Sequence, residues 1–116
     1  ISETKMTKET ENKVAQLQML EQNIQNLLMQ KQTFQSQLIE VDNALEELEK
    51  SKGKVYKIVG PVMVASSKDD MQKEISSKRE ITELRIKSME KQEDQLKEKA
   101  AKLQAEVLSK IKEKGD

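Results

Sequence analysis

The chain has 116 residues, of which 36% are charged and 34% hydrophobic, and its 21 basic and 21 acidic residues give a net charge of zero. Histidine and cysteine are absent, which excludes the commonest general base, thiol chemistry, disulfides and the usual metal ligands. A chain without a basic excess is a poor candidate for nucleic-acid binding, and no apolar run approaches the roughly 18 residues of a membrane span. We therefore expect a cytoplasmic protein with no catalytic residue, no cofactor and no metal.

The first half of the chain carries a coiled-coil pattern. After polar residues 1 to 9, apolar side chains follow alternating steps of three and four, with Lys31 in one of the expected positions. They are Leu17, Leu20, Ile24, Leu27, Phe34, Leu38, Val41, Leu45 and Leu48. A pattern sustained over this length predicts a helical arm at residues 10–52. Gly53 is expected to follow it as a left-handed residue.

The middle segment, KVYKIVGPVMVASS, predicts a β-hairpin at residues 54–66. With the turn at Gly60-Pro61, the expected cross-strand pairs are Val59 with Val62, Ile58 with Met63 and Tyr56 with Ala65. Both faces are then mainly apolar, with Val55, Val59, Val62 and Val64 on one and Tyr56, Ile58 and Met63 on the other. A lone hairpin is marginal in water, and a face in contact with water usually alternates apolar with polar residues. We therefore expect these seven side chains to be covered by other subunits.

Residues 67–114 predict a returning helical arm, with Ser67 as N-cap and Asp70 three residues later. Its heptad register runs through Ile86, Met89, Leu96, Ala100, Leu103 and Val107, with Glu93 as a polar intruder. Four residues near its start fit that register poorly, which suggests packing on the hairpin: Met71, Ile75, Ile81 and Leu84. Arms of equal length predict one mainly α domain (1–116), a long antiparallel two-helix coiled coil with the hairpin at one end and both termini at the other.

The open end of this coiled coil carries more apolar side chains than a two-helix seam can bury. They are Val14, Leu17, Met19 and Leu20 from the first arm, and Val107, Leu108 and Ile111 from the second. Leu17 and Leu20 fit the seam. All seven are candidates for contact with another protein, and the better candidates are the residues off the seam, namely Val14, Met19, Leu108 and Ile111. A flexible methionine suits recognition of many shapes.

Three stretches resemble the prefoldin family, specifically its beta-type subunit, and are more similar to the archaeal than to the eukaryotic form. They are LLMQKQTFQSQLIEVDNALEELEK (27–50), VYKIVGPVMV (55–64) and SMEKQEDQLKEK (88–99). The resemblance implies an ATP-independent holdase within a hexamer of two alpha and four beta subunits joined through their hairpins. It also implies that the tips capture non-native client proteins and deliver them to a group II chaperonin. Lys110 and Lys112, at the tip, are candidates for chaperonin contact.

Two other interpretations stay open. An adaptor coiled coil, docking through its hairpin on one specific partner, accounts for the heptads but not for the off-seam apolar residues. A parallel homodimer through the first arm is disfavoured by a hairpin at mid-chain. Binding of unrelated unfolded proteins distinguishes the holdase from the adaptor.

Overall fold

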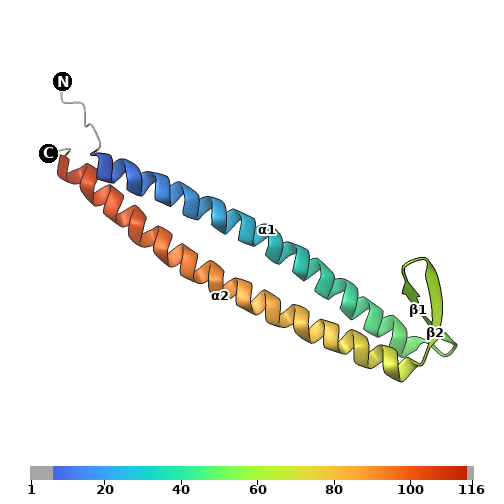
Figure 1. Cartoon of the computed structure of the whole chain (residues 1–116). Helices are drawn as coiled ribbons and strands as arrows, with labels where there is room; N and C mark the ends of the chain where they lie inside the picture. The colour runs from blue at the N-terminus through green and yellow to red at the C-terminus, as the bar shows by residue number, and fades with distance from the viewer. Residues whose placement is uncertain (1–6, 115–116) are drawn as a thin grey trace. The chain divides into compact units, whose positions relative to one another are not determined.

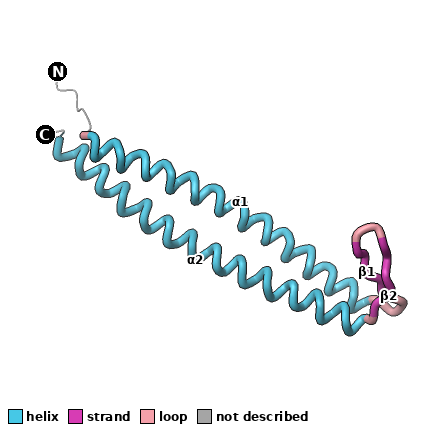
Figure 2. Tube along the Cα trace, viewed as in Figure 1, coloured by secondary structure: helices cyan, strands magenta, loops and turns pink. Residues whose placement is uncertain are grey.

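The computed structural model describes residues 7–114, which form two long helices with a hairpin between them (Figure 1). The elements are α1 (Lys8–Lys50), β1 (Val55–Val59), β2 (Val62–Ser66) and α2 (Lys68–Lys114) (Figure 2). The predicted mainly α fold is confirmed. α1 begins two residues before the predicted start at residue 10, because Thr7 caps it: the Thr10 N–H donates to Thr7 Oγ1 at 3.2 Å.

The described residues divide into two compact units. The terminal unit comprises the residues up to Gln30 and from Met89 onward, and the hairpin unit comprises residues 31–88. Contacts between the helices of the hairpin unit run in opposite chain order, from Phe34 to Arg85, from Asp42 to Arg79 and from Glu49 to Lys68. The helices of this unit are therefore antiparallel. In the terminal unit, Lys13 Nζ lies 3.3 Å from Glu106 Oε2 on the other helix.

A strip of heptad positions is withdrawn from solvent in both units. Leu27, Leu48, Ile86 and Val107 are buried. The other apolar residues predicted for the seam are half-buried, as expected for a two-helix pair that covers each side chain from one direction. The heptad pattern thus located the buried strip in both helices.

Glu93 occupies the seam position predicted for it: it is 7% exposed, and its carboxylate lies 2.7 Å from Lys97 Nζ. Another feature of the α2 seam differs from the prediction. Ile81 and Leu84 are 51% and 60% exposed, so the prediction that they pack on the hairpin is wrong.

The reason is that polar residues continue the seam toward the hairpin. Counting back in sevens from Ile86 and Met89 reaches Arg79, Thr82 and Ile75. Thr82 is buried, and the other two are half-buried. Ile75 therefore belongs to the register after all.

Arg79 connects the two helices of the hairpin unit. Its Nε donates to Asp42 on α1, and its Nη1 lies 2.8 Å from Glu83 on α2. The hydrogen bond to Asp42, followed by the charges of Asp42 and Glu83, raises the pKa of Arg79. A raised pKa stabilises the fold below the unfolded-state pKa of arginine, and this stability is lost only as the pH rises through the folded value. The contact is therefore insensitive to pH across the neutral range.

The helix α1 ends in a different way from the one predicted. Gly53 is not left-handed, because only Gly60 has a positive φ among residues 7–114. Instead, the Lys68 ammonium donates to the carbonyl oxygens of Glu49 at 2.9 Å and of Ser51 at 3.2 Å. A lysine from the start of α2 thus satisfies carbonyls that a helix end leaves without partners. The predicted N-cap of α2 is confirmed, since the Asp70 N–H donates to Ser67 Oγ at 3.1 Å.

Replacing Lys68 by methionine is expected to lower the free energy of unfolding by about 1 kcal/mol. The loss of hydrogen bonds from a charged donor costs roughly 1.5–3 kcal/mol, and removing a positive charge from a helix N-terminus regains about 0.3–1 kcal/mol. Urea denaturation followed by helical circular dichroism measures the difference. Lys73→Met, at an exposed lysine of the same helix, is the matched control. An equal loss in both variants would contradict the capping role.

The hairpin register agrees with the prediction. The observed pairs are Val55 with Ser66, Tyr56 with Ala65, Lys57 with Val64, Ile58 with Met63 and Val59 with Val62. Gly60 has a φ of 58°, and proline fixes a negative φ at the next position. This combination matches a type II′ turn, whose twist suits a two-residue hairpin.

Candidate assembly and client-binding surfaces

The hairpin presents apolar side chains on both faces. On one face, Ile58 and Met63 are 71% and 66% exposed, and Tyr56 beside them is also exposed. On the other face, the exposed residues are Val59, Val62 and Val64, whereas Val55 is half-buried. So much apolar surface on ten strand residues is typical of a site that another protein covers.

The strands also have unpaired edges. Within residues 7–114, β1 and β2 pair only with each other, so one edge of each strand keeps backbone N–H and C=O groups that lie ready to pair with a further strand. Apolar faces and open edges together describe a surface suited to the addition of strands from another chain.

The terminal unit separates the predicted client-binding residues into two groups. Met19, Leu108 and Ile111 are exposed, at 68%, 58% and 41%. The remaining four are withdrawn to different degrees, since Val14, Leu17 and Leu20 are half-buried and Val107 is buried. Val107 therefore belongs to the seam and is inaccessible in this conformation. Lys110 and Lys112 are exposed.

Three of the residues predicted to bind clients occupy heptad positions on the same side of the coiled coil in the terminal unit. Val14, Val107 and Ile111 stand 28 residues, or four heptads, from Asp42, Arg79 and Glu83, the residues of the ion cluster in the hairpin unit. Because side chains four heptads apart occupy equivalent positions in a coiled coil, Val14 and Ile111 are expected to flank Val107 on the same side. Sequence periodicity and burial thus describe a small apolar flank here.

Three further apolar side chains are exposed, and the sequence pattern did not identify them as surface residues. Ile39, Ile81 and Leu84 lie on the helices of the hairpin unit and are 62%, 51% and 60% exposed. A helical wheel that includes the polar seam residues Arg79 and Thr82 would have placed Ile81 and Leu84 outside. Singly exposed apolar residues are common on proteins.

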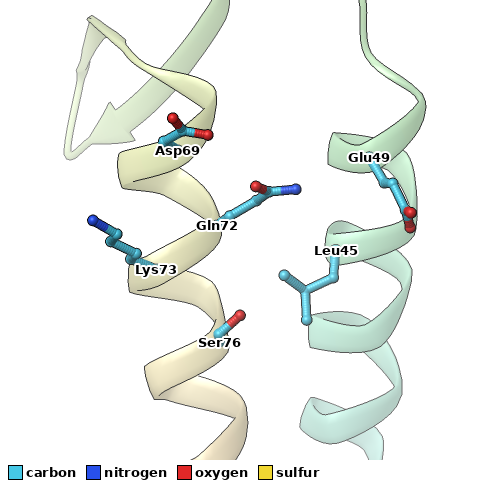
Figure 3. Close-up of a pocket in the computed structure, with 6 residues that line it drawn as sticks. All are labelled: Leu45, Glu49, Asp69, Gln72, Lys73 and Ser76. Atoms are coloured by element: carbon cyan, nitrogen blue, oxygen red, sulfur yellow. The ribbon is translucent and has the colours of Figure 1, made fainter.

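Two hollows within the hairpin unit are open to solvent and lined mainly by polar side chains. The one in Figure 3 has a volume of about 480 Å³ and lies between the end of α1 and the start of α2. Leu45 and Gln72 point into the gap, whereas the carboxylates of Glu49 and Asp69 belong to opposite helices. Among residues 7–114, no group of three or more acidic side chains is arranged to hold a metal ion. Neither helix, over its described residues, has a stretch long and apolar enough to cross a membrane.

The geometry thus defines a class of fold: two long helices with a β-hairpin between them, whose apolar side chains are exposed on both faces. Comparison with protein families agrees, because the model described as "Prefoldin subunit" matches residues 11–114. The chain therefore belongs to the prefoldin family of non-enzymatic chaperone subunits.

Individual relatives specify the type of subunit. The chain is 39% identical over 101 residues to the prefoldin beta subunit of Archaeoglobus fulgidus, covering 85% of this chain and 87% of the relative. It is 35% identical to that of Saccharolobus islandicus strain L.S.2.15, covering 96% and 92%. The crystal structure of the prefoldin beta subunit from Thermococcus strain KS-1 matches with a TM-score of 0.89 and 32% identity, covering 94% of this chain and 97% of that one. These matches confirm the beta type predicted from the sequence, and a beta subunit assembles with other prefoldin subunits.

Proposed function

We propose that the chain is one of four beta-type subunits which, with two alpha-type subunits, form a hexameric holdase in the cytoplasm. This complex captures non-native proteins without ATP and passes them to a group II chaperonin. The observation that carries the proposal is the exposure of Met19, Leu108 and Ile111. The seam of the coiled coil does not use these side chains, and they leave apolar surface accessible in the terminal unit.

Assembly through the hairpin accounts for its composition. A strand added at an open edge gains backbone hydrogen bonds, and apolar faces gain about 25 cal/mol for each Å² removed from water. Ile58 and Met63 form a cross-strand pair on the most exposed face, so a neighbouring subunit that covers one also covers the other. Isolated, the same hairpin leaves both side chains in water.

Client capture through the terminal unit requires weak contacts that tolerate many shapes. Met19 supplies a flexible thioether, which adapts to irregular apolar surfaces. The apolar surface that Met19, Leu108 and Ile111 expose on one subunit is small, so its affinity for a client is low. Several subunits in one complex raise the effective concentration of such surfaces, and an extended unfolded chain can contact more than one.

Suppression of aggregation tests this function. Two unrelated, chemically denatured proteins are diluted into buffer without nucleotide, and light scattering is followed with and without the complex of this chain and its alpha-type partner. The holdase is expected to reduce scattering for both. An adaptor with one specific partner leaves both curves unchanged, and that result would contradict the proposal.

Contact with the chaperonin is expected to involve Lys110 and Lys112. Both ammonium groups are exposed in the terminal unit, and replacing them by glutamate reverses the charge that they present. The double variant is expected to bind a group II chaperonin at least about fivefold more weakly in surface plasmon resonance, with the deficit shrinking at high salt. Lys91→Glu with Lys99→Glu, at exposed lysines of the same helix, adds the same charge as a control. Unchanged binding of the Lys110 and Lys112 variant would exclude this role.

A further inference from the structure

One charged side chain lies within an apolar face of the hairpin. Lys57 follows Val55 on β1 and stands opposite Val64 on β2, so its neighbours on that face are valines. Its Nζ lies 2.6 Å from Oε1 of Glu74 on α2, at a separation of 17 residues along the chain. This is an ion pair between the sheet and a helix.

An ion pair with α2 implies that the hairpin residues near Lys57 are less exposed to solvent than those on the opposite face. On the face of the ion pair, Val55 and Lys57 are half-buried, whereas Val59, Val62 and Val64 are about half exposed. On the opposite face, Ile58 and Met63 are the most exposed large apolar residues of the strands. The part of the hairpin that carries Val55 and Lys57 is therefore turned toward α2, and Ile58 and Met63 are turned away.

We propose that the Lys57–Glu74 ion pair fixes the orientation of the hairpin on α2 and that Lys57 and Glu74 are positioning residues for subunit assembly. Besides the ion pair, the two connections to the helices define this orientation. Ser67 is the single residue between β2 and α2, and residues 51–54 separate α1 from β1. Lys68 holds the two helix ends together below the hairpin. The ion pair joins β1 directly to α2. This additional contact restricts rotation of the sheet about these connections.

The inference rests on the proposed assembly through the hairpin and adds the residues that orient it. The side chains of Lys57 and Glu74 are 44% and 50% exposed, and an exposed pair of this kind shifts an equilibrium by about two- to fivefold. A complex that contains several copies of the chain multiplies this factor. We therefore expect a graded weakening of assembly, by roughly tenfold in the concentration at which half of the complex has formed.

A charge swap tests the pair. The variants are Lys57→Glu, Glu74→Lys and the double swap, each mixed with the alpha-type partner and followed by native mass spectrometry over a range of concentrations. Each single variant is expected to need roughly tenfold more protein to assemble, and the double swap is expected to recover most of the loss. Lys54→Glu, an exposed lysine outside the strands, controls for the change in net charge. Circular dichroism checks that every variant keeps its helices.

The outcomes separate this inference from the proposed function. Normal assembly of the single variants overturns the positioning role, and so does a double swap as weak as the singles or a Lys54→Glu loss of the same size. The assembly proposal itself depends on a different variant, in which Ile58 and Met63 are both aspartate. If that variant also assembles normally, assembly through the hairpin is wrong. If only that variant fails, the hairpin assembles without help from Lys57 and Glu74.

Discussion

Replacing Ile58 and Met63 together by aspartate is expected to leave the helices intact and to abolish assembly with other prefoldin subunits. The two residues face each other across the hairpin and are 71% and 66% exposed, so the isolated chain tolerates the change. In a complex, each new carboxylate would be buried under a neighbouring subunit without a partner, which costs several kcal/mol per group. We expect at least about a 100-fold loss of assembly, measured by native mass spectrometry.

The matched control adds the same two charges outside the hairpin. Ser36→Asp with Ser88→Asp places them at exposed positions of α1 and α2. This control is expected to assemble as the unmodified chain does. Assembly of the hairpin variant at the same concentration as the control would show that the exposed apolar faces are not the joint between subunits.

Replacing Met19, Leu108 and Ile111 by glutamine is expected to remove most of the protection against aggregation while leaving assembly unchanged. The three side chains are 68%, 58% and 41% exposed, so their loss changes the seam little. Each buried apolar side chain contributes up to about 1.5–3 kcal/mol to binding. The loss of three on every beta subunit should therefore weaken client binding by at least about 100-fold. Light scattering of a denatured client, diluted into the assembled complex without nucleotide, measures this loss.

The hairpin unit offers a control of equal size. Ile39, Ile81 and Leu84 are exposed to a similar degree, and their replacement by glutamine removes a comparable apolar area from the helices. This control is expected to protect clients normally. If both triple variants lose protection equally, apolar surface along the whole of the helices binds clients, and the assignment to the terminal unit is wrong.

The parts of the fold that follow a short period were predictable from the sequence. Apolar residues at alternating steps of three and four located the buried strip, including Leu27, Ile86 and Val107. The Gly60-Pro61 turn set the hairpin register, because the side-chain period of two leaves no freedom once the turn is placed. These features depend on neighbours in sequence, and local chemistry specifies them.

Contacts that join distant parts of the chain were not predictable in this way. The cap of α1 comes from Lys68, whose donor lies 19 residues beyond the Glu49 carbonyl, and a glycine near the helix end suggested the commoner local cap. Arg79 occupies a seam position because Asp42, 37 residues earlier, accepts its hydrogen bond. A heptad pattern based on apolar residues alone does not identify a seam position that is occupied by arginine.

Accessibility in the terminal unit was predictable only in part. Leu17 and Leu20 fit the seam register, and both are half-buried. Val107 was grouped with the client-binding residues although its heptad position assigns it to the seam, where it is 7% exposed. The burial of a single residue at the end of a coiled coil depends on how far the two helices stay paired, which the period does not specify.

The contact of Lys68 with the end of α1 also has a consequence for the order of folding. Lys68 reaches α1 across 19 residues, and Lys57 reaches α2 across 17. Lys13 and Glu106, in contrast, are 93 positions apart in the sequence (106 − 13). Because the entropy lost on closing a loop grows with its length, contacts around the hairpin form at the lowest entropic cost. We therefore expect pairing of α1 and α2 to start beside the hairpin and to reach the terminal unit last, and the helix segments that carry Met19 and Leu108 to be the first to separate when the chain opens.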